Sequence, residues 1–484
     1  MTDSTDSTET TEEPQKGIAR QVVQNTAATP PDIAKAAKTP RYAWVILLVT
    51  YLASLSAPLG QFKVTLMSSV LADVTGTGAG YFVGMDAPSF GLLMSSLAII
   101  GAILAFPGAF ICRRLGLKWT SIIAVACVIL GGLIGVFAGP TAVWQLYIGR
   151  FVEGIGIGLI GVSAPTIISL WFPDKTRGLA LGFWCTWVPM AIVIDFNLTP
   201  FILSSTAASS PNHVPDWHPM FWFVIVFAAV ALVLFALLFR LPKGAHADYA
   251  IEGNFKDCFK YLKNKYIWIL GLTFMVFNFC QGGVVNTYYN AFLEGGMQFG
   301  VDSGWGATPQ ISGFMTMFVA LIGIVANPVF GGMTGRLKLR WRFLAVTAFA
   351  LLYIICFNPW VGFFQQPGAS VLAGTAADPM PQPQLWVFII LMGLAAAVGG
   401  GGSRPLAPSI LSSSAMAATM GMAVMQFTQC VGTVMAPIFG LALNSTHSWG
   451  TAALYVLMPL SIVALLLSFF IRADKSKDRG VDVH

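Results

Sequence analysis

Two short basic segments, far apart in the chain, are near copies of each other. Residues 114–119 read Arg-Leu-Gly-Leu-Lys-Trp, and residues 336–341 read Arg-Leu-Lys-Leu-Arg-Trp. Each lies between two long apolar runs, which predicts a short loop between two hydrophobic helices. A second matching pair follows in the same order: residues 164–169 read Ala-Pro-Thr-Ile-Ile-Ser, and residues 407–412 read Ala-Pro-Ser-Ile-Leu-Ser. Matches at equivalent places in two halves indicate parallel repeats related by an axis along the membrane normal.

The composition around these repeats is that of a membrane protein. Of 484 residues, 56% are hydrophobic and only 10% are charged, whereas a soluble domain carries roughly 25% charge. This excludes a soluble enzyme, a disordered protein and a nucleic-acid binder of the usual kinds. A spanning helix needs about 20 apolar residues, so the chain is long enough for about a dozen.

Apolar runs separated by Gly, Pro or charge predict twelve spanning helices. Their ranges are 43–71, 89–111, 119–138, 144–171, 179–204, 220–240, 267–292, 311–335, 341–358, 385–411, 415–442 and 449–471. The predicted fold class is therefore an all-α membrane protein with twelve transmembrane helices in two six-helix repeats.

The basic residues set the orientation. All but three of the 27 Lys and Arg fall in segments on one side, and the loops of the other side carry only acidic charges. Because Lys and Arg concentrate in cytoplasmic loops, both termini are predicted to be cytoplasmic. The predicted domains are a disordered cytoplasmic tail (1–42), an N-terminal six-helix bundle (43–240), a cytoplasmic linker (241–266), a C-terminal six-helix bundle (267–471) and a second cytoplasmic tail (472–484).

The seven cysteines show no metal-ligand or Cys-x-x-Cys spacing, and six fall in or at the ends of predicted spans. This pattern favours neither a disulfide framework nor a metal site. We also find no nucleotide-binding loop, so the energy for transport is expected to come from an ion or substrate gradient. No cofactor is expected.

Several segments resemble the major facilitator superfamily between about residues 41 and 472. The loop at 109–118 is similar to the family's signature between its second and third spans. Residues 150–158, Arg-Phe-Val-Glu-Gly-Ile-Gly-Ile-Gly, look like its motif in the fourth span, and residues 171–182 are familiar from the loop that follows. The resemblance implies a secondary transporter whose first, fourth, seventh and tenth spans line a central cavity. It does not imply a substrate.

This sequence also departs from the family pattern. Arg113 and Gly335 stand where the family has an acidic residue that latches the outward-facing state. Either another residue closes the inner gate here, or the latch is weak. The drug–proton antiporter motif is degraded at residues 187–192. The general character is closer to metabolite porters of the organic-anion and oxalate/formate kind.

Five charges lie inside predicted spans: Lys63, Arg150, Glu153, Asp195 and Arg404. A charge in the hydrocarbon core costs at least about 3 kcal/mol on insertion scales, so each is a candidate for function. Lys63 and Arg404 are predicted to bind an anionic substrate. The alternatives are a lysine that extends to the lipid headgroups and an arginine paired structurally near the inner end of its span.

The remaining three charges are candidates for proton coupling or gating. Arg150 and Glu153 are three residues apart on one helix face, so they are predicted to pair with each other. The family resemblance suggests a coupling role for Arg150, and a purely structural pair is the alternative. Asp195 has no local partner, which favours a proton site. It could instead pair with Lys63 or Arg404.

Polar residues follow the apolar part of the seventh span. Of these, Gln281, Asn286 and Tyr288 are predicted to orient a substrate, and the alternative is hydrogen bonding between helices with an aromatic belt. Gln426 and Gln429, about one turn apart, have the same two interpretations.

We therefore expect an alternating-access secondary active transporter of a small organic anion, a mono- or dicarboxylate, driven by proton symport or anion exchange. We expect a monomer in the lipid bilayer of the inner cell membrane, with a small-molecule substrate and a proton or counter-anion as its partners. No enzymatic activity and no nucleic-acid partner are expected. The alternative is a proton-coupled exporter of amphipathic or cationic compounds that binds them through Asp195 and Glu153.

Overall fold

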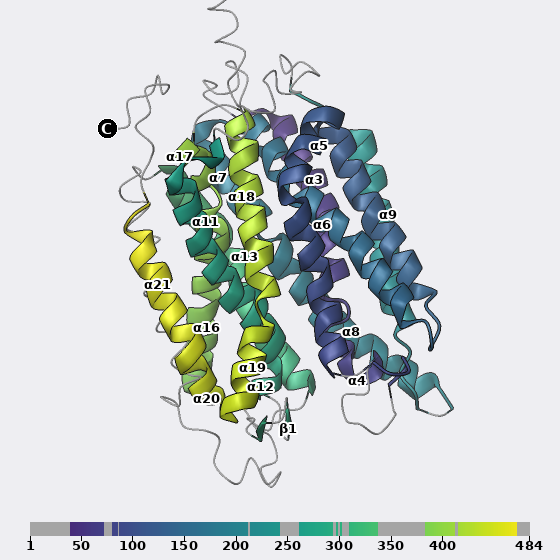
Figure 1. The fold of residues 1–484 in the computed structure, drawn as a ribbon. Helices are drawn as coiled ribbons and strands as arrows, with labels where there is room; N and C mark the ends of the chain where they lie inside the picture. Colours follow the sequence, from purple (N-terminus) through teal and green to yellow (C-terminus); the bar gives the residue numbers. More distant parts are fainter. Residues whose placement is uncertain are drawn as a thin grey trace, which may run out of the picture.

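The computed structural model describes residues 39–71, 80–85, 87–211, 213–242, 261–293, 297–298, 301–302, 309–336, 383–411 and 415–471. Nearly all of this part of the chain is helical, and long helices run side by side from one end of the molecule to the other (Figure 1). Ten of the described helices are long and apolar enough to cross a membrane. The prediction of an all-α membrane protein is therefore confirmed.

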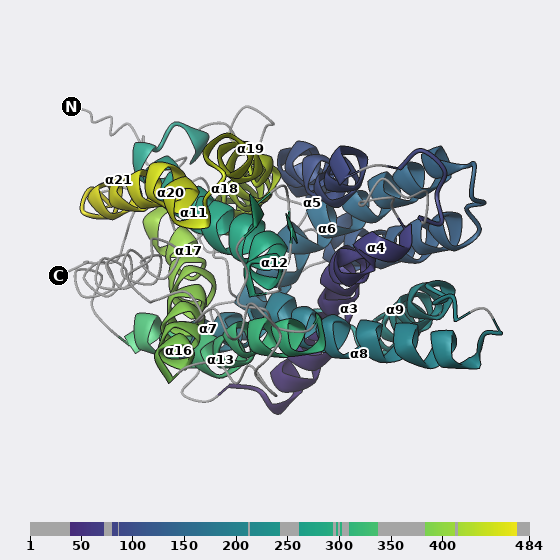
Figure 2. The same ribbon diagram turned by 90° about the horizontal axis from the view of Figure 1, so that it is seen from below.

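The first half of the chain forms one group of helices, coloured purple through blue to teal, most of which lies on the right in Figure 2. Its elements are α3 (Arg41–Phe62), the short helices η1 (Thr65–Met67) and α4 (Ser68–Leu71), α5 (Ala87–Val136), α6 (Val143–Trp171), α7 (Asp174–Trp184), α8 (Trp187–Ser209) and α9 (His218–Leu238).

The predicted second and third spans are joined without an extended loop. Helix α5 contains both, with a single non-helical residue at Gly116, where φ is 76° and ψ is 161°. A positive φ is open to glycine at little cost because glycine has no Cβ. Gly116 therefore lets the chain turn back on itself within the basic segment 114–119.

The second half forms the other group. Its elements are α11 (Lys265–Asn278), η2 (Phe279–Tyr289), α12 (Asn290–Leu293), α13 (Pro309–Arg336), α16 (Pro383–Ala397), η4 (Val398–Ser403), α17 (Leu406–Leu411), α18 (Ala415–Val434), α19 (Pro437–Thr446), α20 (Trp449–Ala452), η5 (Ala453–Leu457) and α21 (Met458–Ser468). Two short strands, β1 (Met297–Gln298) and β2 (Val301–Asp302), pair antiparallel between α12 and α13.

Part of the predicted topology falls outside the described residues. The predicted span at 341–358, most of the linker, residues 1–38 of the first tail and the whole of the second tail belong to this part. The count of twelve helices, the cytoplasmic termini and the domain limits therefore stay predictions.

The two groups touch closely where α7 crosses α13 (Figure 2). A Cβ placed at Gly331 would lie 2.3 Å from the carbonyl oxygen of Gly178 and 2.7 Å from the Cα of Gly182. Glycine is thus required for the two backbones to approach this closely. The contact lies beside the predicted cytoplasmic segment that contains Lys175, so it joins the two groups at that end.

For the secondary transporter that the sequence predicts, Gly331→Ala is expected to slow transport by about tenfold. Overpacking of this kind costs about 1–3 kcal/mol in the conformation in which α7 and α13 touch. The measurement is the initial rate of substrate uptake into proteoliposomes at matched protein content. Gly332→Ala is the matched control, since its Cβ would meet only Leu179 Cδ1, at 3.7 Å. Equal rates for the two variants would contradict a role for the crossing in transport.

Candidate substrate cavity and buried charge cluster

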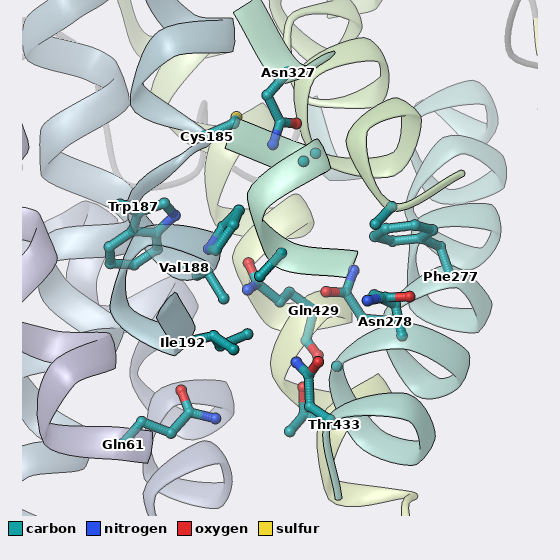
Figure 3. Close-up of a pocket in the computed structure, with 18 of the residues that line it drawn as sticks. Gln61, Cys185, Trp187, Val188, Ile192, Phe277, Asn278, Asn327, Gln429 and Thr433 are labelled. Atoms are coloured by element: carbon teal, nitrogen blue, oxygen red, sulfur yellow. The ribbon is translucent and has the colours of Figure 1, made fainter. Parts of the chain in front are cut away.

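A cavity lies between the two groups of helices. It holds about 930 Å³ of space free of protein atoms, part of it open to solvent. Figure 3 shows side chains from both halves of the chain around it. Its polar lining consists of Gln61, Asn278, Gln281, Asn286, Asn327, Arg404, Gln426, Gln429 and Thr433. Aromatic and aliphatic side chains, including Trp187, Phe274 and Phe277, complete the wall.

Among the described residues that line the cavity, Arg404 is the one with a charged side chain. It lies between η4 and α17 and is 3% exposed. Its Nη2 donates hydrogen bonds to the side-chain oxygens of Gln426, at 3.3 Å, and of Gln429. Its guanidinium carbon lies 4.9 Å from the ring centroid of Trp184 and 5.6 Å from that of Phe274. Amides and aromatic faces thus hold the guanidinium in place.

No carboxylate among the described residues forms an ion pair with Arg404. Its neighbours are neutral amides, aromatic rings and the thiols of Cys185 and Cys430. A buried guanidinium without a counter-charge is expensive. An anion in the cavity would supply the missing charge.

The segment before Arg404 can adopt its conformation because it consists of glycine residues. Residues 399–402 are all glycine, and they lie in the π-helix η4. A Cβ at Gly401 would lie 2.3 Å from the backbone oxygen of Asn327, and the Gly401 N–H donates to Asn327 Oδ1 at 2.7 Å. The close contact between η4 and α13 therefore fixes the segment that carries Arg404. Asn327 was not singled out from the sequence, although an amide inside an apolar span was a usable signal.

The polar residues predicted in the seventh span separate into two sets. Gln281 and Asn286 line the cavity, as does Asn278. Asn278 donates to the Phe274 carbonyl oxygen at 2.7 Å, while Gln281 Oε1 is buried and has no hydrogen-bond partner among the described residues. Tyr288 is not part of the lining, and its ring packs against Phe439 with centroids 5.4 Å apart.

The other four intramembrane charges lie together in the first group of helices, and we call Lys63, Arg150, Glu153 and Asp195 the buried charge cluster. Glu153 lies at its centre. It accepts a hydrogen bond from Lys63 Nζ through one oxygen, and its other oxygen accepts from Arg150 Nη1 at 2.8 Å. The predicted Arg150–Glu153 pair is therefore confirmed.

Lys63 is fully buried and does not reach the surface of the protein. Besides its bond to Glu153, its Nζ lies 4.1 Å from the ring centroid of Phe221. The alternative of a lysine extending to the lipid headgroups is wrong, because the side chain points into the protein. Lys63 is not among the residues that line the cavity. A direct contact between Lys63 and substrate stays a prediction.

Arg150 connects the buried charge cluster to the cavity. Its guanidinium donates to the backbone oxygens of Gly60, at 2.5 Å, and of Gln61, at 2.9 Å. These carbonyls lie in the last turn of α3, where helix carbonyls lack partners of their own. The side chain of Gln61 lines the cavity (Figure 3). A change in the cluster can therefore act on the cavity wall through the end of α3.

Asp195 is fully buried, and neither of its carboxylate oxygens has a hydrogen-bond partner among the described residues. The charges of Lys63 and Arg150 act on it, but none of the ion pairs in this part of the chain includes it. Of the two partners suggested by the sequence, Lys63 is the one within electrostatic range.

Glycine contacts between α5 and α6 hold Glu153 in place. A Cβ at Gly131 would lie 2.4 Å from the Gly149 carbonyl oxygen and 2.7 Å from Glu153 Cγ. A Cβ at Gly156 would lie 2.6 Å from the carbonyl oxygen of Ala124. The interpretation of the glycines after Glu153 as close helix packing is confirmed.

Comparison with known proteins identifies the family to which the chain belongs and proteins that are similar to it. The family model described as Major Facilitator Superfamily matches residues 43–376. The chain is 22% identical to the lysosomal dipeptide transporter of Bos taurus over 57% of this chain and 60% of that protein. It is 24% identical to a Bacillus subtilis (strain 168) protein named "Probable galactarate/D-glucarate transporter", over 43% of this chain and 42% of that protein.

Two solved structures share the fold. The proton:xylose symporter superposes with a TM-score of 0.63 at 15% identity, covering 90% of this chain and 97% of that one. The E. coli fucose:proton symporter gives 0.62 at 13% identity, covering 90% and 98%. The predicted fold is therefore confirmed. The matches to the first two relatives span about 60% and 42% of their lengths, so their activities are not carried over to this chain.

Proposed function

Because this chain belongs to the Major Facilitator Superfamily, we propose that it is an alternating-access secondary active transporter of a small organic anion, a mono- or dicarboxylate. The observation that carries this proposal is Arg404. Its buried guanidinium faces the cavity without a carboxylate partner among the described residues. A guanidinium presents parallel N–H groups that match the two oxygens of a carboxylate.

The arrangement of the other charges supports the same proposal. In the buried charge cluster, two basic and two acidic side chains lie together, so their charges can cancel. Arg404 is outside that cluster, and its described neighbours are neutral amides, thiols and aromatic rings. The positive charge of Arg404 is thus available to pair with an anionic substrate. The name of the Bacillus subtilis relative specifies carboxylate sugar acids, which agrees with an anionic substrate.

The alternative of a cation exporter receives less support. Such a transporter would need an acidic residue in its binding cavity, and none lines the cavity in the part of the chain that the structure describes. The carboxylate of Glu153 already pairs with Lys63 and Arg150, and Asp195 is buried and is not among the residues that line the cavity.

We propose that the buried charge cluster couples transport to protons or to a counter-anion. Asp195 is the candidate proton carrier, because its oxygens lack hydrogen bonds and a neutral carboxyl is cheaper to bury than a carboxylate. Arg150 provides the link to the cavity through Gln61. We place the protein in the inner cell membrane as a monomer.

We expect Asp195→Asn to abolish accumulation of substrate driven by an inward proton gradient while leaving exchange of substrate across the membrane active. Asparagine has nearly the same shape as aspartate, but its amide cannot bind and release a proton. The measurement is uptake into proteoliposomes with and without a pH gradient. Asp216→Asn is the control, since Asp216 is half-exposed in a loop beside His218. Gradient-driven accumulation by Asp195→Asn equal to the wild type would contradict this coupling role.

The proposed function is tested by currents from proteoliposomes on a solid-supported membrane. Concentration jumps of mono- and dicarboxylates, and separately of organic cations, are applied with and without a pH gradient. We expect saturable responses to carboxylates. Saturable responses to cations alone would overturn the anion proposal in favour of the exporter.

A further inference from the structure

The chemistry of the cavity lining narrows the class of anion. This inference rests on the proposed function, because it assumes that Arg404 binds the anionic group. We infer that the substrate is a hydroxylated monocarboxylate of sugar-acid type, bound with its carboxylate at Arg404 and its hydroxyl groups along the amide side chains that lead to Gln281.

The number of charges in the lining limits the charge of the substrate. Among the described residues that line the cavity, Arg404 is the one cation, and no Asp or Glu is present. A dicarboxylate would leave its second charge without a counter-charge, which is costly in a desolvated site. A dipeptide zwitterion would leave its ammonium group unpaired for the same reason. A neutral sugar would leave the Arg404 guanidinium unpaired.

The cavity wall beyond Arg404 favours hydroxyl groups over a hydrocarbon chain. Gln281 lines the cavity, and its Oε1 atom is buried and lacks a hydrogen-bond donor among the described residues. An acceptor oxygen in this position needs a donor, which a hydroxyl supplies and a second carboxylate or an alkyl chain does not. Leaving such a group unpaired costs about 1–3 kcal/mol.

The spacing of these groups fits a substrate with several carbon atoms. Arg404 lies against the ring of Phe274, and Gln281 follows seven residues later in the same run of helix. This corresponds to about 10 Å along a helix axis. Asn278 follows between these levels, and the hydroxyl of Thr433 would lie 3.2 Å from a Cβ at Gly282, the residue after Gln281. Both side chains combine donor and acceptor groups. In Figure 3, Asn278 and Gln429 appear at about the same height, and Thr433 lies below them.

A series of six-carbon compounds tests this inference, because its members differ only in the groups at issue. The probes are D-gluconate with one carboxylate and hydroxyls, D-glucarate with two carboxylates, hexanoate without hydroxyls, and D-sorbitol without a carboxylate. Binding to the purified full-length protein is measured by thermal stabilisation over a range of concentrations. Counterflow of labelled gluconate into proteoliposomes then measures transport.

We expect gluconate to bind at least about tenfold more tightly than glucarate or hexanoate, and sorbitol not to bind. Glucarate or hexanoate binding as tightly as gluconate would overturn this inference and leave the anion proposal standing. Binding of sorbitol or of the zwitterion alanyl-alanine, with no binding of gluconate, glucarate or hexanoate, would overturn both.

The variant Gln281→Leu tests the role of the amide directly. We expect it to weaken gluconate binding about tenfold and to leave hexanoate binding unchanged, because hexanoate has no donor for that oxygen. Gln145→Leu is the matched control, since Gln145 lies at the start of α6 and outside the lining. A uniform loss of both ligands in Gln281→Leu would contradict the hydroxyl contact, because it would report a structural effect.

Discussion

Arg404→Gln is expected to lower the initial rate of carboxylate uptake by about a hundredfold. Hydrogen bonds to a charged group are worth about 1.5–3 kcal/mol each, and a carboxylate can accept two from a guanidinium. A loss of about 2.8 kcal/mol already corresponds to about a hundredfold. The measurement is the initial rate of labelled-carboxylate uptake into proteoliposomes with equal amounts of folded protein.

Two further variants separate charge from geometry at this position. Arg404→Lys keeps a cation but loses the planar fork and the contact with both glutamines, so we expect an intermediate rate. Arg240→Gln is the control, because Arg240 is exposed, lies against the ring of Tyr42 and is not among the residues that line the cavity. This variant should transport like the wild type. Wild-type uptake by Arg404→Gln would refute the role of Arg404 in binding.

The second large effect concerns stability. Glu153→Gln is expected to destabilise the protein by about 3–5 kcal/mol, because it leaves Lys63 and Arg150 buried together without the carboxylate that pairs with both. The measurement is thermal unfolding of the purified protein in detergent, compared at equal concentration.

A double substitution tests whether the loss comes from unpaired charge. Lys63→Met keeps the Arg150–Glu153 pair and should destabilise less than Glu153→Gln. Adding Lys63→Met to Glu153→Gln removes one of the two unpaired cations, and we expect it to restore about 1–3 kcal/mol. Additive losses in the double variant would show that the two residues are not energetically coupled.

The fold was predictable because its signals are local. Apolar runs of spanning length and the basic segments beside them depend only on neighbouring residues, so they are visible in the sequence. The predicted ranges correspond to the observed helices wherever the structure describes them. The Arg150–Glu153 pair was also predictable, because two residues three apart on a helix share a face.

The composition of the site was not predictable, because it depends on distant contacts. Lys63 and Glu153 are 90 positions apart, and only the packing of α3 on α6 brings them together. Lys63 pairs with Glu153 and is not part of the cavity lining, so Arg404 is the cation among the described residues that line the cavity. The glutamines that hold Arg404 were named from the sequence, but their partner depends on how α18 packs beside the segment after η4.

The acidic residue of the family's latch is absent from this chain, which has Arg113 and Gly335 at the two corresponding positions. Gly331, four residues before Gly335, instead forms a close backbone contact with Gly182, between α13 and α7. Van der Waals packing through small residues is a common way for membrane helices to associate. We propose that this contact closes the predicted cytoplasmic end without an ion pair.

The claim that the cavity transports an organic anion through Arg404 is tested most directly by counterflow. Proteoliposomes are loaded with unlabelled carboxylate and diluted into a trace of the labelled compound, so no external driving force is needed. The wild type is predicted to accumulate label transiently, and Arg404→Gln is predicted not to. Transient accumulation of an organic cation with none of any carboxylate, or equal counterflow by both proteins, would contradict the claim.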